Sequence, residues 1–234
     1  MRTLVFSDVH GEPAIITAVV GHSGFDPQTD RLIFAGDAVE VGRDSPGCLE
    51  LLDELGAECL VGNHEFGVFT SWPIEAEPVE PSVQRRVSDD LASGRWRLAA
   101  EADGVLITHA GLGDEFLADF ESAGSAASLA ERLNTEFARA FEAGELAGGR
   151  VVDSAGPLWW RPGRGSEPLP GLTQVIGHTP PEVMHGPDAA ELWAKRGIYL
   201  IDPWVRGWRQ RGFEPPVPVR YAVIEDGSVR VVEG

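Results

Sequence analysis

Five short apolar runs in this chain are each followed, within two residues, by Asp, Asn or His. The runs cover residues 4–6, 32–35, 59–61, 105–107 and 175–176, and the segments after them are Asp8-Val9-His10, Gly36-Asp37, Gly62-Asn63-His64-Glu65, Thr108-His109 and Gly177-His178. Apolar runs of this length are typical of buried strands. Ligands of open α/β sheets bind outside the carboxyl ends of the strands. We therefore expect these polar side chains to converge on one site.

The first third of the chain alternates between strand and helix patterns. Strands are predicted at residues 2–6, 31–35 and 58–61, and helices at 13–20 and 44–55. The second helix has Asp44 as its cap and a proline in its first turn. This alternation predicts a parallel sheet covered by helices. Near the end of the chain, Asp226-Gly227 between two β-rich segments predicts a hairpin.

Length and composition are those of one globular domain. We expect residues 1–234 to form a single domain with insertions at about 67–103 and 113–170; the second is rich in Ala, Glu and Leu and predicts one or two amphipathic helices. The two cysteines, Cys48 and Cys59, are predicted to be buried free thiols, as in a reducing compartment. With no signal peptide and no apolar run of about 20 residues, we expect a cytoplasmic protein without a membrane partner.

The net charge of the chain limits its partners. It is −18, from 37 acidic and 19 basic residues. Binding to nucleic acid needs a basic surface that displaces phosphate counterions, so we expect no nucleic-acid partner. A phosphorylated substrate remains compatible with this charge, because bound metal ions supply strong local positive charge.

The order of the polar segments indicates a site for two metal ions. Asp8-x-His10 would place two side chains on the same side of an extended backbone. Each segment alone is equally consistent with a turn or a helix start, for example with Asn63 as a helix cap. Together they assemble carboxylate, amide and imidazole donors without a thiolate, which suits Mn²⁺, Fe or Zn²⁺ and differs from a closed structural zinc site.

These motifs resemble the calcineurin-like metallophosphoesterases. The segments that carry the resemblance are Asp8-x-His10, Gly36-Asp37-x-x-Glu40, Gly62-Asn63-His64-Glu65, His109-Ala110-Gly111 and Gly177-His178-Thr179. Within the superfamily they are most similar to the branch of serine/threonine phosphoprotein phosphatases, lambda-type phosphatases and symmetrical diadenosine tetraphosphate hydrolases. The resemblance implies an α/β fold, a four-layer β-sandwich flanked by helices, with a dinuclear metal site at the carboxyl ends of the strands.

The resemblance also implies roles for single residues. One metal would be held by Asp8, His10 and Asp37, and the second by Asp37, Asn63, His109 and His178. The cofactors would be two divalent ions, with Mn²⁺ expected first and Fe or Zn²⁺ as alternatives. A hydroxide bridging them would attack phosphorus in line. His64 would act as the general acid, oriented by Glu40.

Position 41 departs from the pattern of this branch. The residue after the acid is typically an arginine that binds phosphate, and here it is Val41. Arg43 and Arg161 are the candidates to replace it, and Arg161 is preferred because Leu158-Trp159-Trp160-Arg161 is similar to a Leu-Trp-x-Arg run of the bacterial members. The alternative is a surface arginine stacked on Trp160. Both tryptophans are candidates to line the substrate mouth.

Three functions are compatible with these residues. The first is hydrolysis of phosphomonoesters, with phosphoserine and phosphothreonine proteins as one substrate class. The second is hydrolysis of dinucleoside polyphosphates such as diadenosine tetraphosphate. The third is a noncatalytic metal-binding scaffold. A phosphodiesterase is less favoured, because Gly-His-Thr-Pro at residues 177–180 lacks a second histidine.

Overall fold

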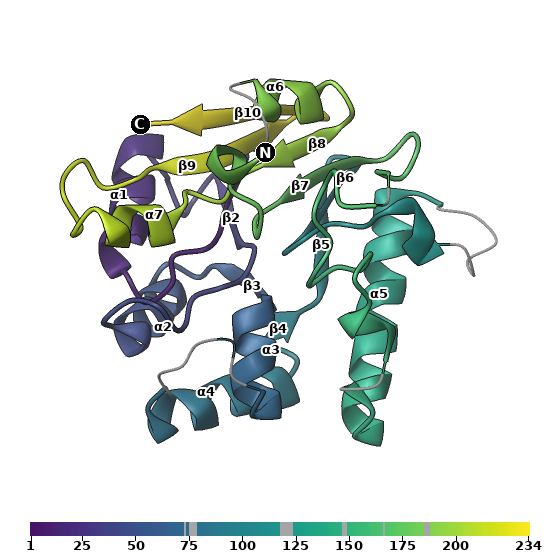
Figure 1. Ribbon diagram of the computed structural model, residues 1–234, viewed down its shortest axis with the longest axis horizontal. Coiled ribbons are helices and arrows are strands. Elements are labelled where there is room, and N and C mark those ends of the chain that lie inside the picture. The colour runs from purple at the N-terminus through teal and green to yellow at the C-terminus, as the bar shows by residue number, and fades with distance from the viewer. Residues whose placement is uncertain (73, 75–78, 118–123, 147–148, 166, 185–187) are drawn as a thin grey trace.

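Two sheets form the centre of the molecule (Figure 1). The computed structural model describes residues 1–72, 74, 79–117, 124–146, 149–165, 167–184 and 188–234. The strands of the first sheet are β1 (Thr3–Phe6), β2 (Arg31–Phe34), β3 (Glu58–Leu60), β4 (Trp96–Arg97), β9 (Arg220–Glu225) and β10 (Ser228–Glu233). Those of the second are β5 (Ala99–Ala102), β6 (Val105–Thr108), β7 (Thr173–Ile176) and β8 (Ile198–Leu200).

The strand order places the first strands of the chain at the centre of the larger sheet. This sheet has the order β10-β9-β1-β2-β3-β4, and the smaller one has the order β5-β6-β7-β8. Strands β1 to β4 run parallel, as do β6 to β8. The predicted hairpin is confirmed, because β9 and β10 pair in antiparallel fashion and both turn residues have positive φ.

Helices cover the outer faces of this sandwich. They are α1 (Pro13–Ser23), α2 (Ser45–Glu54), α3 (Asn63–Thr70), α4 (Pro81–Ala92), α5 (Ala126–Ala143), α6 (Ala189–Ala194) and α7 (Val205–Gln210), with short 3₁₀ turns η1 (Asp114–Leu117), η3 (Arg150–Val152) and η4 (Pro181–Val183). The α/β sandwich implied by the motifs is confirmed. Asp44 caps α2 as predicted, since its side chain accepts the N–H of Gly47 at 2.8 Å.

The alternation of side chains along the central strands explains why there are two sheets. Val5 and Ile33 belong to the apolar layer between the sheets, whereas Leu4 and Phe34 belong to the core under the helices. Both faces of β1 and β2 are thus buried, as near-continuous apolar runs require. The prediction of one parallel sheet was incomplete, because the inner face of the larger sheet is covered by a second sheet instead of helices.

The chain crosses from one sheet to the other at Leu98. Residues 96–102, which we assigned to an insertion, form β4 in the first sheet and β5 in the second. Asn134 on α5 holds the crossing. Its side-chain oxygen accepts the N–H groups of Leu98 and Ala99 at 2.9 and 3.0 Å, and its amide donates to the carbonyl of Ala99 at 2.9 Å. The insertion patterns therefore extend into two strands of the sandwich.

Cys48 and Cys59 are buried and free, as predicted. Within the described part of the second insertion, the amphipathic helix is α5, which buries Leu129, Leu133 and Phe137 on one side. Across the described residues, none of the helices has the length and apolar content that crossing a bilayer needs.

Candidate metal centre

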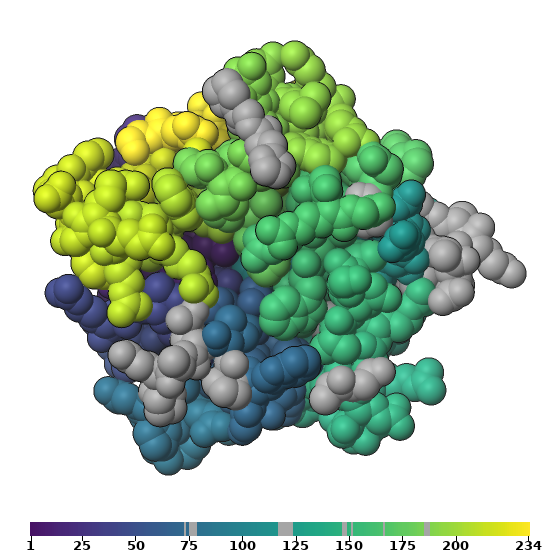
Figure 2. All heavy atoms as spheres, in the orientation of Figure 1, coloured from purple at the N-terminus to yellow at the C-terminus, as the bar shows by residue number. Residues whose placement is uncertain are grey.

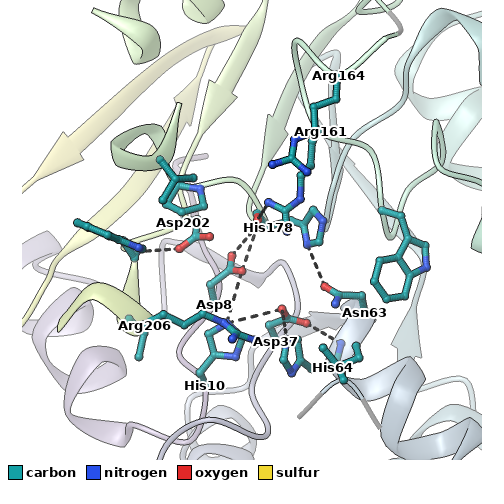
Figure 3. Close-up of a pocket in the computed structure, with 16 residues that line it drawn as sticks. Asp8, His10, Asp37, Asn63, His64, Arg161, Arg164, His178, Asp202 and Arg206 are labelled. Carbon is teal, nitrogen blue, oxygen red and sulfur yellow. Dashed lines mark hydrogen bonds and ion pairs between the residues drawn. The ribbon is translucent and has the colours of Figure 1, made fainter. Parts of the chain in front are cut away.

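The polar residues that follow the apolar strands meet at one edge of the sandwich. Asp8 follows β1, Asp37 follows β2 and Asn63 begins α3 just after β3. His109 and His178 follow β6 and β7 of the second sheet. All five are at most 6% exposed. Except for His109, which lies deeper, they line a pocket of about 370 Å³ (Figure 3).

The turns that carry these residues have unusual backbone conformations. Asp8, His10, Asp37 and His178 have φ angles of 53°, 44°, 66° and 60°. The prediction of an extended Asp8-x-His10 was therefore wrong. The turn is tied to the loop after β2, because the N–H of Asp8 donates to Gly36 and that of His10 to Asp37, both at 2.9 Å. Left-handed conformations cost energy for side-chain-bearing residues, and they concentrate at functional sites.

Two glycines make room for the carboxylates. A Cβ on Gly62 would lie 2.1 Å from Oδ1 of Asp37, and a Cβ on Gly177 would lie 2.1 Å from Oδ2 of Asp8. Neither glycine has a positive φ, so the backbone itself would accept any residue. The absence of a side chain at these positions is therefore needed for the close approach of the acids.

Replacing Gly177 by alanine tests this packing. We expect Gly177→Ala to displace the Asp8 carboxylate, to lower the bound metal per chain and to destabilise the fold by about 1–3 kcal/mol, as overpacking does. Gly21→Ala is the matched control. Its Cβ would meet nothing within 4 Å, and in the last turn of α1 the alanine should stabilise by at most about 0.5–1 kcal/mol. Metal analysis and thermal unfolding of both variants check the prediction; full metal content in Gly177→Ala would contradict it.

Two groups of potential metal donors share the carboxylate of Asp37. One group is His10, Asp37 and His64, and the other is Asp37, His109 and His178; the donor atoms of each group lie within 4.8 Å of one another. Oδ2 of Asp37 lies 3.8 Å from Nε2 of His10 and 3.3 Å from Nε2 of His109. A carboxylate between two sets of imidazoles has the position required to bridge two cations.

The second group includes the amide of Asn63. Its Oδ1 lies 2.8 Å from Nε2 of His109 and 2.9 Å from Nδ1 of His178. Within the described part of the chain, the buried Nε2 of His178 and Nδ1 of His10 have no hydrogen-bond partner. Buried polar atoms without a partner are costly and rare. Both rings belong to the donor groups around Asp37, so this carboxylate and the imidazoles form a donor set that fits metal ions.

The pKa values of the clustered side chains also bear on metal binding. Burial alone would raise the pKa of Asp37, but the imidazoles around it, His109 foremost, hold that pKa well below its usual value. Burial lowers the pKa of His10 to about 3 and shifts the pKa of His178 in the same direction. Burial opposes protonation of His109 too, yet Asp37 raises its pKa to about 9. Asp37 is thus ionised beside two neutral imidazoles, His10 and His178, which is the state that metal binding requires, whereas His109 would release a proton on binding an ion.

His64 and Glu40 form a buried pair beside Asp37. Nδ1 of His64 lies 2.7 Å from Oε2 of Glu40, which leaves Nε2 directed toward Asp37 Oδ2 at 3.8 Å. Burial lowers the pKa of His64, but Asp37 and Glu40 raise it more, so the net shift is upward. The ring is thus held by one nitrogen and available for proton transfer at the other. The Glu40 carboxylate is thus within hydrogen-bond distance of the imidazole.

Residues 1–207 match the family model described as calcineurin-like phosphoesterase. The chain belongs to this family. It is 41% identical to serine/threonine-protein phosphatase 1 of Salmonella typhimurium over 61 residues, 26% of this chain and 28% of that protein. It is 31% identical to the symmetrical bis(5'-nucleosyl)-tetraphosphatase of Chromohalobacter salexigens over 124 residues, 48% of this chain and 45% of that protein.

The matches to curated relatives are partial, whereas those to solved structures extend over the whole chain. The chain spans between 27% and 52% of the length of the curated relatives it matches. A cold-active protein-tyrosine phosphatase of a Shewanella species superposes with a TM-score of 0.59 at 15% identity, covering 98% of this chain and 80% of that one. A protein serine/threonine phosphatase of Saccharomyces cerevisiae gives 0.58 at 15% identity, covering 100% and 79%. These similarities establish the calcineurin-like phosphoesterase fold.

Glu65 has a role in this phosphoesterase site that the sequence did not indicate. It is fully buried, and its carboxylate accepts backbone N–H groups at 2.7 to 3.2 Å from four residues, Asp37, Ala38, Val39 and Gly62. Glu65 therefore holds the loop after β2 against the start of α3. The alternative of Asn63 as helix cap was wrong, since Gly62 is the cap and Asn63 the first helical residue.

Of the two arginines that are candidates for phosphate binding, one lies in the pocket and the other does not. Arg161 lines the pocket, and its Nη1 donates to the carbonyl of His178 at 2.7 Å. Arg43 is exposed, does not line this pocket and has its guanidinium 4.7 Å from the ring centre of Phe213. Of the two tryptophans, Trp159 lines the pocket, whereas Trp160 is 1% exposed and lies in the core. Stacking of Arg161 on a surface Trp160 is therefore excluded.

The pocket lining extends beyond the predicted site residues and includes Asp202, Arg164, Trp204 and Arg206. Asp202 had the same signal as the predicted acids, because it follows the apolar strand β8. Burial raises its pKa to about 6. The arginines and Trp204 had no comparable signal, because they lie in a loop and at a short helix and none of them directly follows an apolar strand.

Proposed function

We propose that this protein is a metal-dependent phosphohydrolase that cleaves phosphomonoesters, including those of phosphoserine or phosphothreonine proteins. The observation that carries the proposal is the Asp37 carboxylate between two groups of imidazole donors at the carboxyl ends of the strands. Membership of the phosphoesterase family supports it. The cytoplasmic location, and the absence of nucleic-acid and membrane partners, stay predictions from the sequence.

The proposed metal ligands divide into two sets that share one residue. Asp8, His10 and Asp37 would hold one ion, and Asp37, Asn63, His109 and His178 the other. Bound there, two divalent ions would activate a water molecule for in-line attack and neutralise phosphoryl oxygens. Carboxylate, amide and imidazole donors favour Mn²⁺ as the first choice, with Fe or Zn²⁺ as alternatives.

His64 is proposed to protonate the leaving oxygen. Its Nδ1 is held 2.7 Å from the Glu40 carboxylate, so that a proton on Nε2 faces the pocket. Its raised pKa favours the protonated form that a general acid needs. Glu40 fixes the ring and stabilises its charge.

Arg161 is proposed to bind the phosphate. One Nη atom is anchored on the carbonyl of His178, which holds the guanidinium at the wall of the pocket. Burial lowers the pKa of Arg161, but guanidinium groups stay protonated in proteins. A fixed guanidinium fork matches the oxygens of a phosphate group.

Hydrolysis of dinucleoside polyphosphates is the second candidate. The observation that favours it is the presence of two indole rings, Trp159 and Trp204, in the lining of the same pocket. Aromatic rings at the mouth would stack on a nucleobase, at about 1–3 kcal/mol for each stacked base. Relatives of 29–33% identity include symmetrical bis(5'-nucleosyl)-tetraphosphatases.

Metal-stripped protein with and without added Mn²⁺ tests both candidates. We expect hydrolysis of p-nitrophenyl phosphate only in the presence of metal. Faster turnover of a phosphothreonine peptide than of diadenosine tetraphosphate would select the phosphatase, and the reverse order would select the dinucleotide hydrolase. Two bound metals without turnover of any of the three would contradict the enzyme and favour the scaffold.

A further inference from the structure

The short helix α7 forms one wall of the pocket that contains the metal centre. Val205 and Arg206 of this helix line the pocket, next to Trp204. In Figure 2, the yellow-green C-terminal part of the chain borders a hollow with purple N-terminal atoms at its bottom. In Figure 3, Arg206 is labelled beside Asp8 and His10, to the left of the centre, whereas Arg161 lies above it.

Three contacts determine how α7 is placed. Gly207 packs on the indole of Trp204, since a Cβ on this glycine would lie 2.4 Å from the ring. Trp208 is buried and its indole N–H donates to the carbonyl of Glu214 at 2.7 Å. The guanidinium of Arg209 donates to the carbonyl of Val41. The helix is therefore fixed on the core at one side and on the loop of Glu40 at another.

This placement determines where Arg206 lies. Val205, Gly207 and Trp208 are buried, and Arg206 between them is exposed at the mouth of the pocket. Arg209, three residues later, lies on the same face of the helix and reaches the loop after β2. Arg206 is therefore on the face of α7 that is turned toward the loop after β2. This loop contains the metal-ligand candidate Asp37, and His10 is hydrogen-bonded to it.

Arg206 adds positive charge to the pocket lining. The other cations in the pocket lining, Arg161 and Arg164, come from the loop before β7. Positive charge thus borders the centre from two walls that are supplied by distant parts of the chain.

From this arrangement we infer that Arg206 is a second phosphate-binding residue, which contacts the phosphoryl oxygens of the bound substrate from a different wall than Arg161. The inference rests on the proposed function, because it concerns the same site. A phosphate between two guanidinium groups has its oxygens bound on two sides, which orients it in the pocket. Val41 contributes no cation. Its backbone carbonyl instead accepts the hydrogen bond from Arg209 that anchors α7, the helix that carries Arg206.

Inorganic phosphate is the probe that tests the inference. With protein reconstituted with Mn²⁺, we expect Arg206→Ala to weaken the dissociation constant for phosphate, measured by titration calorimetry, by about 10- to 100-fold, as the loss of a charged hydrogen bond does. Arg206→Lys should lie between, since it retains the charge without the planar fork. KM for p-nitrophenyl phosphate should rise in parallel, while metal content stays at two ions.

Arg230→Ala is the control for the change in net charge. This arginine is exposed on β10 and does not line the pocket, so its loss should leave phosphate affinity unchanged. An unchanged affinity in Arg206→Ala, an equal loss in Arg230→Ala, or loss of metal in Arg206→Ala would each overturn the inference. The binding measurement does not depend on turnover. Wild-type protein that binds phosphate through Arg206 but hydrolyses nothing would refute the proposed function alone.

Discussion

Asp37→Asn is expected to abolish both metal binding and turnover. The asparagine keeps the volume of the side chain and an oxygen that accepts the N–H of His64, a contact of 3.0 Å in the native protein. It loses the charge and the second oxygen, which lies near His10 and His109. Because one carboxylate serves both donor groups, we expect fewer than two ions per chain. The rate should fall by more than the roughly 10²–10³-fold that loss of one electrostatic contact costs.

The control for this variant is Asp89→Asn, the same chemical change at an exposed position of α4. It should retain two metal ions and full activity. Thermal unfolding of both variants without metal separates a folding defect from a loss of ligands. Near-normal turnover in Asp37→Asn would refute the assignment of this residue as the bridging ligand.

His64→Ala is expected to have the second largest effect. We expect kcat to fall by about 10²–10⁴-fold for a phosphothreonine peptide, as loss of a general acid does, with metal content unchanged. For p-nitrophenyl phosphate the loss should be much smaller, because its leaving group needs little protonation. Glu40→Gln, which weakens the charge on the imidazole partner, should reduce kcat less than His64→Ala does.

Metal analysis distinguishes the acid from a ligand. His64 lies with His10 and Asp37 in one donor group, so a direct metal contact is a specific alternative. Loss of one ion in His64→Ala would establish that alternative, and an equal loss of kcat for both substrates would contradict the acid role. His22→Ala is the control, since this exposed histidine of α1 contacts the hydroxyl of Tyr221 far from the pocket.

The convergence of the metal-ligand candidates was predictable from the sequence. Asp8, Asp37 and His178 each follow a buried strand, and parallel strands bring their carboxyl ends to one edge. The same rule applied to Asp202, which follows β8, and would have found it. By contrast, the backbone of Asp8-x-His10 was predicted wrongly, because side-chain periodicity does not reveal that both residues adopt left-handed φ.

Contacts between distant segments were beyond the reach of sequence patterns. The crossing of the chain at Leu98 depends on Asn134, which is 36 residues away. The four N–H groups on Glu65 come from two separate loops. The three arginines of residues 204–211 do not by themselves indicate which of them reaches the pocket, since the position of Arg206 follows from the packing of α7 on Val41.

The sequence by itself determined the strands other than β4 and β5, their parallel order at the amino-terminal end, the donor residues and the family to which they belong. These properties follow from local patterns, because burial of short apolar runs and the chemistry of Asp, Asn and His are encoded within a few residues. Tertiary structure decided the division into two sheets, the pairing of His64 with Glu40 and the arginines around the pocket. Such contacts join segments remote in the chain, and their geometry results from packing of the whole core.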